Sequence, residues 1–457
     1  MASLAAPTSW PTLADFLHVL TFQSGHNTAV VLAGVTLLGV AAGTVGTFAL
    51  LRRRALMSDA LSHAALPGIA VAFLLAAALG FSGRNLWLLL AGAACSGILG
   101  VLVVQFIVSR TRLPIDAAMG AVLSVFFGLG LVLMSHIQTL GTGDQGGVGK
   151  FIYGQTAAMT SLEATSIAVV ALVAVLASLA LLKEFRLVCF DPEFAHAQGW
   201  PVDWIDLLMM ALVVAVTVIG MRAVGLILVI ALIIIPAAAA RFWTERLEVM
   251  VVLSAAIGGL SGYLGAAASA VLPNFPAGAV IVLVAGALFL VSLLLAPARG
   301  VVASALRLAR LRLDVASQHV LRAAFETAER GRAGADQPVD LATLRGLRSW
   351  PRSWLALVTR SLQWRGLVEL RERGIVLTPA GRVDALRITR NHRLWEQFLV
   401  TYADLAPSHV DHSADLVEHI LSPEMIAELE RELGARGRLP RGLDVPPSVH
   451  PLGSGAA

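Results

Sequence analysis

The stretch Met57-Ser58-Asp59-Ala60-Leu61-Ser62-His63-Ala64-Ala65-Leu66-Pro67-Gly68 leads directly into the apolar segment Ile69–Leu79. Asp59 and His63 are four residues apart, which places them on one face of a helix. Because the apolar residues extend for about half a membrane thickness, this ionisable pair is costly unless it faces a polar cavity, a partner or an ion. A carboxylate and an imidazole also make half of a site for a divalent first-row metal. We expect either metal contact or the simpler alternative, a hydrogen-bonded pair or helix cap.

The composition separates a membrane part from a soluble part. In the 457-residue chain 57% of residues are hydrophobic and 14% are charged, which is too apolar for a soluble protein of this size. Residues 1–300 hold 13 Lys and Arg and 12 Asp and Glu, whereas residues 301–457 hold 21 and 18. We therefore predict a transmembrane domain over residues 1–300 and a soluble domain over residues 301–457. The two cysteines, Cys95 and Cys189, lie beside apolar runs, which argues against a disulfide scaffold or a cysteine zinc site.

Apolar runs long enough to cross a bilayer set the expected topology. They lie at about 28–51, 66–80, 86–109, 117–135, 161–182, 204–220, 222–240, 247–270 and 277–296. The second run is short and Gly220-Met221-Arg222 interrupts the stretch 204–240, so we predict an all-α polytopic protein with eight or nine spans. Basic clusters fall at alternate exits: Arg52–Arg54, Arg110 and Arg112, Lys183 and Arg186, Arg241 and Arg246, and Arg299. That side is expected to be cytoplasmic, and the C-terminal domain leaves from it.

The apolar pattern breaks between residues 183 and 203. Asp191 as N-cap and Pro192 at the first helical position predict a short helix that ends at Gly199. A short cytoplasmic helix between two spans suits docking of another protein. The alternative is an ordinary loop helix that lies in the membrane interface.

Three segments in order and spacing resemble the permease subunits of bacterial ABC importers for manganese, zinc and iron. They are Ala60-Leu61-Ser62-His63-Ala64 with Pro67-Gly68, then Asp-Pro-Glu-Phe-Ala at 191–195, then Val224–Arg241, which ends Ile-Ile-Pro-Ala-Ala-Ala-Ala-Arg. The resemblance covers about residues 28–297. One departure is Ser58, where the family more often has glycine.

This resemblance implies a multi-pass protein of the bacterial inner or plasma membrane, in which two permeases surround a central pathway. Asp59 and His63 would be metal ligands in that pathway, paired with their equivalents on the second permease, and an external metal-binding lipoprotein would deliver the ion. Cytoplasmic ATPases would dock on the 190–200 helix, through Phe190, Asp191, Pro192, Glu193, Phe194, Ala195 and Gly199. The chain has no Gly-x-x-x-x-Gly-Lys-Ser/Thr loop, so ATP hydrolysis is expected from the partner and not from this chain.

The pattern after Leu311 is that of soluble amphipathic helices. We predict a helix over Ser317–Arg330, a helix–turn–helix from Val339–Leu347 and Pro351–Arg365, and a hairpin over Leu367–Thr378 that turns at Arg373-Gly374. Helix, helix–turn–helix and hairpin in that order make a winged helix.

Residues of about 315–435 resemble the winged-helix and dimerisation domains of the diphtheria toxin repressor and manganese repressor family. The resemblance is carried by Leu377–Arg382, Thr389–Leu399 and Ala414–Pro423. It implies metal ligands at His392, Glu396, Asp415, Glu418 and His419, with His319 at a ligand-like position. Asp415 in place of cysteine leans toward manganese. Two departures are Arg322, where manganese repressors place an acid, and Asp411, where an ancillary histidine is often found. The alternative is that these residues are relic ion pairs.

Together these features predict the permease subunit of an ATP-driven importer of a divalent transition metal, with Mn²⁺ favoured over Zn²⁺ or Fe²⁺, and a metal-sensing regulatory tail. A membrane-tethered, metal-responsive DNA-binding regulator is the alternative, because Arg345, Arg348, Arg352, Arg360 and Arg365 give the helix–turn–helix a basic bias. The tail carries only three net positive charges, so we favour regulation over nucleic-acid binding. An intramembrane metalloenzyme is disfavoured, because there is no His-Glu-x-x-His helix and one chain offers too few ligands.

Overall fold

The computed structural model describes residues 13–52, 54, 57–79, 85–139, 156–272, 275–329, 337–347, 350–372, 374–402, 422–435 and 445–446. The chain divides into two compact units, Met1–Ser304 and Ala305–Ala457.

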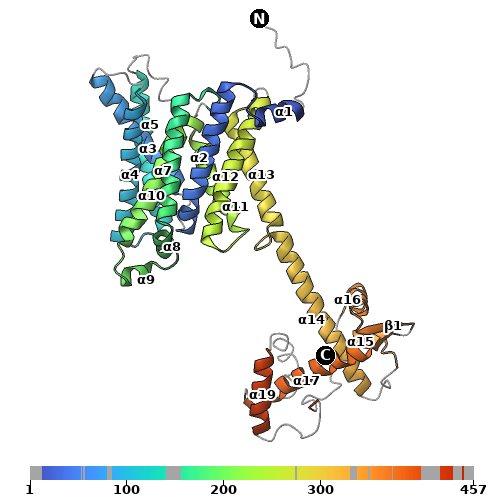
Figure 1. The fold of residues 1–457 in the computed structure, drawn as a ribbon. Helices are drawn as coiled ribbons and strands as arrows, with labels where there is room; N and C mark the ends of the chain where they lie inside the picture. Colours follow the sequence, from blue (N-terminus) through green and yellow to red (C-terminus); the bar gives the residue numbers. More distant parts are fainter. Residues whose placement is uncertain are drawn as a thin grey trace. The chain divides into compact units, whose positions relative to one another are not determined.

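The first unit is a helical bundle (Figure 1). Its elements are α1 (Leu13–Leu20), α2 (His26–Leu51), α3 (Met57–Ala78), α4 (Leu86–Arg110), α5 (Ile115–Thr139), η1 (Thr156–Ala158), α7 (Ser161–Ala180), α8 (Leu182–Phe190), α9 (Pro192–Ala197), α10 (Val202–Val224), α11 (Leu226–Arg241), α12 (Leu247–Val271) and α13 (Ala277–Leu295). Within the described ranges, eight of these helices are long and apolar enough to cross a membrane, namely α2, α3, α4, α5, α7, α10, α12 and α13. The prediction of an all-α polytopic protein is confirmed.

Two boundaries differ from the sequence prediction. The second span begins at Met57 and not near residue 66, because the polar stretch that carries Asp59 and His63 is itself helical. The interruption expected at Gly220-Met221-Arg222 falls instead at Gly225, where φ is +89° and α10 gives way to the shorter α11. A glycine tolerates this backbone conformation, which residues with a side chain rarely adopt.

Helices α2, α3 and α10 form the centre of the bundle and are the most buried of the spans. Helix α12 packs along α2, where Ser254 Oγ donates a 2.6 Å hydrogen bond to the carbonyl oxygen of Gly43. Helices α4, α5, α7 and α13 have apolar side chains over much of their exposed surface. Such a surface suits a lipid environment, in which apolar side chains need no cover.

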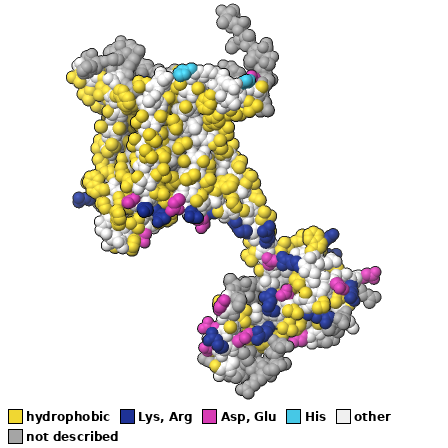
Figure 2. Space-filling view, in the orientation of Figure 1, with side chains coloured by type: hydrophobic (Ala, Val, Ile, Leu, Met, Phe, Trp, Pro, Cys, Tyr) yellow, Lys and Arg dark blue, Asp and Glu magenta, His cyan; other side chains and the backbone are white. Residues whose placement is uncertain are grey.

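Charged side chains gather at one end of this bundle, the end that carries α8 and α9, and apolar side chains cover its length (Figure 2). Arg186 of α8 pairs with Glu248 in the first turn of α12, and Arg299 after α13 pairs with Glu245 after α11, with N–O distances of 2.7 and 2.8 Å. This distribution agrees with the alternate basic clusters on which the predicted orientation rests.

The second unit has the predicted order of a winged helix. Its elements are α14 (Val301–Glu329, which begins just before the unit boundary), α15 (Leu341–Leu347), α16 (Arg352–Trp364), β1 (Val368–Arg371), β2 (Gly374–Leu377), α17 (Pro379–Tyr402) and α19 (Pro423–Ala435). The hairpin is antiparallel, and a bridge from Val339 to Ile375 adds a third short segment. Helix α14 is much longer than the predicted Ser317–Arg330, because the stretch after Gly300 continues as helix.

Candidate functional site

Asp59 lies in the first turn of α3, and His63 lies one turn further on. His63 Nε2 is 3.5 Å from Asp59 Oδ1, and their side chains are 21% and 38% exposed. The neighbouring residues Ala60, Leu61 and Ala64 are almost fully buried. The two ionisable side chains therefore share a partly uncovered face of α3.

His63 is mostly covered by its neighbours. Its Nδ1 is buried and has no hydrogen-bond partner among the described residues. The ring packs edge-on against Phe127 of α5, with centroids 4.7 Å apart. Pro67 lies inside α3 and has no N–H, so it cannot donate the helical hydrogen bond that the His63 carbonyl oxygen would otherwise accept.

The described residues of one chain do not complete a metal site at this position. In the part of the chain that the structure describes, no group of three or more His, Cys, Asp or Glu side chains could hold an ion. Asp59 and His63 together supply one carboxylate and one imidazole, which is half of a four-ligand set.

Helix α3 is held closely by its neighbours. A Cβ on Gly68 would come within 2.1 Å of the carbonyl oxygen of Gly92 on α4, so only glycine permits this helix contact. Ala64 lies one turn before Gly68, and its carbonyl oxygen accepts a 2.6 Å hydrogen bond from Ser96 Oγ of α4. These contacts fix the backbone that carries His63.

A buried ion-pair cluster lies at the entrance to α3. Asp206, on the first turns of α10, is 3% exposed and accepts hydrogen bonds from Arg52 Nε at 2.9 Å and from Arg54 Nη1. Arg52 Nη1 also donates to the Val188 carbonyl oxygen of α8 at 3.1 Å. From the sequence, these arginines indicate only the orientation, and Asp206 is not among the predicted site residues. The signal was available, because a lone acid inside an apolar run is costly without a partner.

The predicted docking helix is present as α9. Asp191 Oδ1 accepts a 2.9 Å hydrogen bond from the Phe194 amide, and Pro192 occupies the first turn. Gly199, with φ at +80°, follows its end. Ala195 faces inward and is fully buried.

The outward side of α9 and of the residue before Asp191 carries exposed aromatic side chains. Phe190 is 57% exposed, Phe194 is 50% exposed, and Glu193 is exposed beside them. Aromatic side chains at an exposed helix end suit a protein contact.

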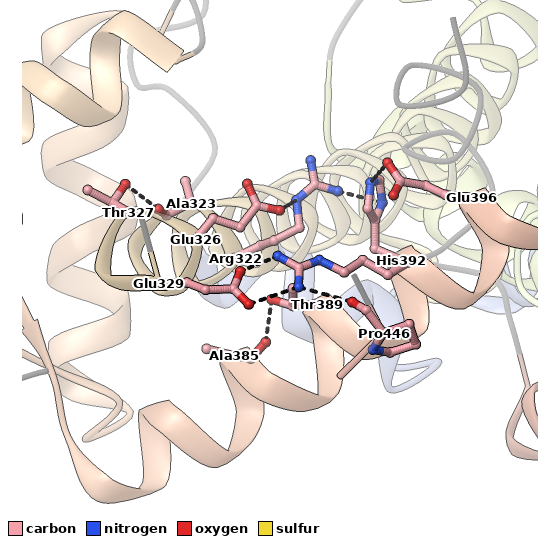
Figure 3. A network of polar contacts seen from close by, with 11 residues as sticks. Arg322, Ala323, Glu326, Thr327, Glu329, Ala385, Thr389, His392, Glu396 and Pro446 are labelled. Atoms are coloured by element: carbon pink, nitrogen blue, oxygen red, sulfur yellow. Dashed lines mark hydrogen bonds and ion pairs between the residues drawn. The ribbon is translucent and has the colours of Figure 1, made fainter. Parts of the chain in front are cut away.

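In the second unit, the structure brings His392 and Glu396 together, with His392 Nε2 3.1 Å from Glu396 Oε1 and both side chains fully buried. Arg322, which stands where manganese repressors place an acid, lies on the other side of the His392 ring. Arg322 Nη1 is 2.5 Å from His392 Nδ1, and Arg322 Nε is 3.7 Å from Glu326 Oε1 (Figure 3). A guanidinium beside His392 does not fit a metal ion bound to that imidazole, because both are cations that compete for one place.

A second arginine joins the same helices. Arg393, 2% exposed, forms an ion pair with Glu329 of α14 and donates a 3.1 Å hydrogen bond to the Pro446 carbonyl oxygen (Figure 3). Arg393 and Glu329 are not among the site residues predicted from the sequence, in which they look like ordinary helix charges.

The other predicted tail ligands are His319, Asp415, Glu418 and His419. His319 is buried and lines a cavity of about 510 Å³ beside Trp350 and Trp354. Asp415, Glu418 and His419, with the departure at Asp411, lie outside the described residues.

A bundle of membrane-length helices with an ionisable pair inside one of them indicates a membrane transport protein. Residues 26–296 match the ABC 3 transport family, and the chain belongs to that family. Residues 378–447 match a second family, described as iron dependent repressor, metal binding and dimerisation domain. Both resemblances drawn from the sequence are confirmed.

The relatives that match carry the names of metal transport proteins. The chain is similar to the manganese transport system membrane protein MntC of Bacillus subtilis (strain 168), 37% identical over 390 residues, or 85% of this chain and 87% of that protein. It is 42% identical over 273 residues to the zinc transport system membrane protein TroC of Treponema pallidum (strain Nichols), covering 59% of this chain and 89% of that protein. A solved structure described as PsaBC from Streptococcus pneumoniae in complex with Fab aligns with a TM-score of 0.54 and 31% identity, over 63% of this chain and 98% of that chain.

Proposed function

We propose that this chain is the membrane-spanning permease subunit of an ATP-driven importer of divalent transition metals, with Mn²⁺ as the favoured substrate. The observation that carries the proposal is the half-site on α3, where Asp59 and His63 share a partly uncovered face and His63 Nδ1 has no partner among the described residues. A second permease would bring an equivalent pair to this face and complete the ligand set.

The donor chemistry supports the choice of substrate. Carboxylate oxygen and imidazole nitrogen accept Mn²⁺, Fe²⁺ or Zn²⁺, and a pair made of Asp59 and His63 contains no thiolate that would trap the softer ions. One comparison favours manganese among them. A relative that matches along 85% of the chain, so that its alignment of 390 residues extends into the tail, is a manganese transport protein.

The energy for transport would come from a partner ATPase that docks on α9. Phe190 and Phe194 supply the exposed apolar contact, and the buried Ala195 ties the helix to the bundle. Arg52 bonds both the α8 backbone and Asp206 on α10, and Asp206 also binds Arg54 just before α3. Through these contacts, movement at α9 would be passed to the start of α3. An extracytoplasmic metal-binding lipoprotein would supply the ion from the other side of the membrane.

The tail would be a cytoplasmic regulatory domain. It leaves the bundle after α13, and the charged end of the bundle is the predicted cytoplasmic side. The alternative, a DNA-binding regulator, is favoured by the winged-helix order and by exposed arginines on α15 and α16. Binding of the full chain to operator DNA that weakens steeply with salt would support that alternative.

The test of the transport proposal is uptake of radiolabelled Mn²⁺ and Zn²⁺ by cells that express the full transporter. Asp59→Ala and His63→Ala should abolish uptake at normal membrane levels, whereas a chain truncated after about residue 300 should still import. Asp116→Ala and His136→Ala are matched controls, because both residues are exposed on α5. Normal uptake in both α3 variants would refute the pathway assignment.

A further inference from the structure

We propose that the guanidinium of Arg322 takes the place of a metal ion in the tail, so that His392 and Glu396 are held by an internal cation. This inference concerns the tail alone and does not depend on the transport function. It replaces the metal site expected at His392 and Glu396 with a permanent ion-pair cluster.

The geometry centres on one buried ring. His392 and Glu396 are fully buried, and Arg322 and Glu326 are 6% and 9% exposed. Arg322 reaches His392 Nδ1 at 2.5 Å, and Glu396 Oε1 lies 3.1 Å from Nε2 on the opposite side (Figure 3). Arg322 comes from α14, whereas His392 and Glu396 come from α17, so the cluster joins the two helices.

The partners of the ring decide where its proton lies. A guanidinium has only donors and is always protonated, so Nδ1 must accept. A neutral imidazole then carries its proton on Nε2, where it donates to the carboxylate of Glu396. Neither nitrogen of His392 retains a lone pair for a metal. Arg322 therefore excludes a metal ion from Nδ1, because its guanidinium occupies that place. It also excludes the ion from Nε2, because it fixes the tautomer in which Nε2 carries the proton.

The charges of the cluster give the guanidinium the role that a cation would otherwise fill. Glu326 and Glu396 are both buried carboxylates. The guanidinium of Arg322 lies between Glu326 and the ring of His392 and supplies a positive charge there. Buried carboxylates without a cation are strongly disfavoured. Arg393 and Glu329 add a second ion pair between the same helices. Arg322 and Arg393 therefore place two positive charges between α14 and α17, with or without a metal ion.

The experiment measures Mn²⁺ binding by the purified full-length chain carrying Asp59→Ala and His63→Ala, so that the proposed pathway pair contributes nothing. The probe is Mn²⁺ alone, and electron paramagnetic resonance of the free ion reports how much is bound. With Arg322 intact, we expect no Mn²⁺ binding that depends on His392. Arg322→Glu removes the cation and adds a carboxylate, so the chain should gain about one Mn²⁺ equivalent, lost again on adding His392→Ala.

Arg310→Glu is the matched control, because it makes the same charge change at an exposed position of the same helix and should gain nothing. Arg322→Gln tests the loss of the cation without a new ligand and should bind Mn²⁺ more weakly than the Glu variant. His392-dependent binding with Arg322 intact would overturn the proposal, and this result requires no substitution at position 322. Failure of both variants at position 322 to gain the ion, when both are folded, would also overturn it.

Discussion

Arg54, which lies just before α3, donates a hydrogen bond to the buried carboxylate of Asp206 near the start of α10. The same carboxylate binds Arg52 at the end of α2. One acid therefore fixes both sides of the connection into the helix that carries Asp59 and His63. Arg52 in turn connects this site to α8, because it donates a hydrogen bond to the Val188 carbonyl oxygen.

Replacing Asp206 with asparagine should destabilise the bundle. The change leaves two guanidinium groups without their counter-charge in a buried site, and breaking such a pair costs about 3–5 kcal/mol. We expect a clear fall in the thermal unfolding midpoint of the detergent-purified chain. Asp203→Asn, one turn earlier and exposed, removes the same charge and should leave the midpoint nearly unchanged. Equal midpoints for the two variants would show that the buried pairs contribute nothing.

Cys189 on α8 offers a reporter for this region. Burial is the largest cause that raises the pKa of its thiol to about 12, with Arg52 lowering it and Asp206 raising it. Since the thiolate is the reactive form, alkylation of Cys189 in a Cys95→Ser chain should be very slow at pH 7. The rate should rise about tenfold per pH unit up to pH 10, while the thiol remains mostly protonated. Alkylation at pH 7 as fast as that of free cysteine would contradict the burial of this thiol.

The sequence predicted the parts of the fold that depend on local pattern. Most of the membrane-length apolar runs, the N-cap at Asp191 and the hairpin of β1 and β2 depend on neighbouring residues, and they lie where expected. The break at Gly225 was misplaced because Gly220-Met221-Arg222 has a polar residue that the helix tolerates. Arg222 binds Glu163 on α7 at 2.9 Å, a partner 59 residues away.

The candidate sites divide in the same way. The shared face of Asp59 and His63 follows from helical spacing, as does the contact of His392 with Glu396. Asp206 and its arginines are more than 150 residues apart, and no local pattern connects them. Arg322 was visible as a departure from the repressor pattern, but only the structure shows its guanidinium against the ring of His392.

Close contact between α3 and α4 should be sensitive to a single methyl group. Gly68→Ala places a Cβ against the Gly92 carbonyl oxygen, so α3 must move away from α4. We expect a lower thermal midpoint and reduced Mn²⁺ uptake, because the same backbone carries His63. Gly120→Ala on α5 meets nothing within 4 Å and should be neutral or stabilising, since alanine is favoured over glycine in a helix by about 1 kcal/mol. Similar losses in both variants would mean that the contact is not the cause.

The α9 cap gives a direct test of the docking helix. Asp191→Ala removes the acceptor for the Phe194 amide, which costs about 1 kcal/mol and should fray the helix that presents Phe194. Asp191→Asn retains an acceptor of similar capping strength while removing the charge. We therefore expect the alanine variant to retain less of the partner ATPase on purification and to import Mn²⁺ more slowly, with the asparagine variant near wild type. Equal loss in the two variants would show that the charge of Asp191 contacts the partner, and that its role as a cap is secondary.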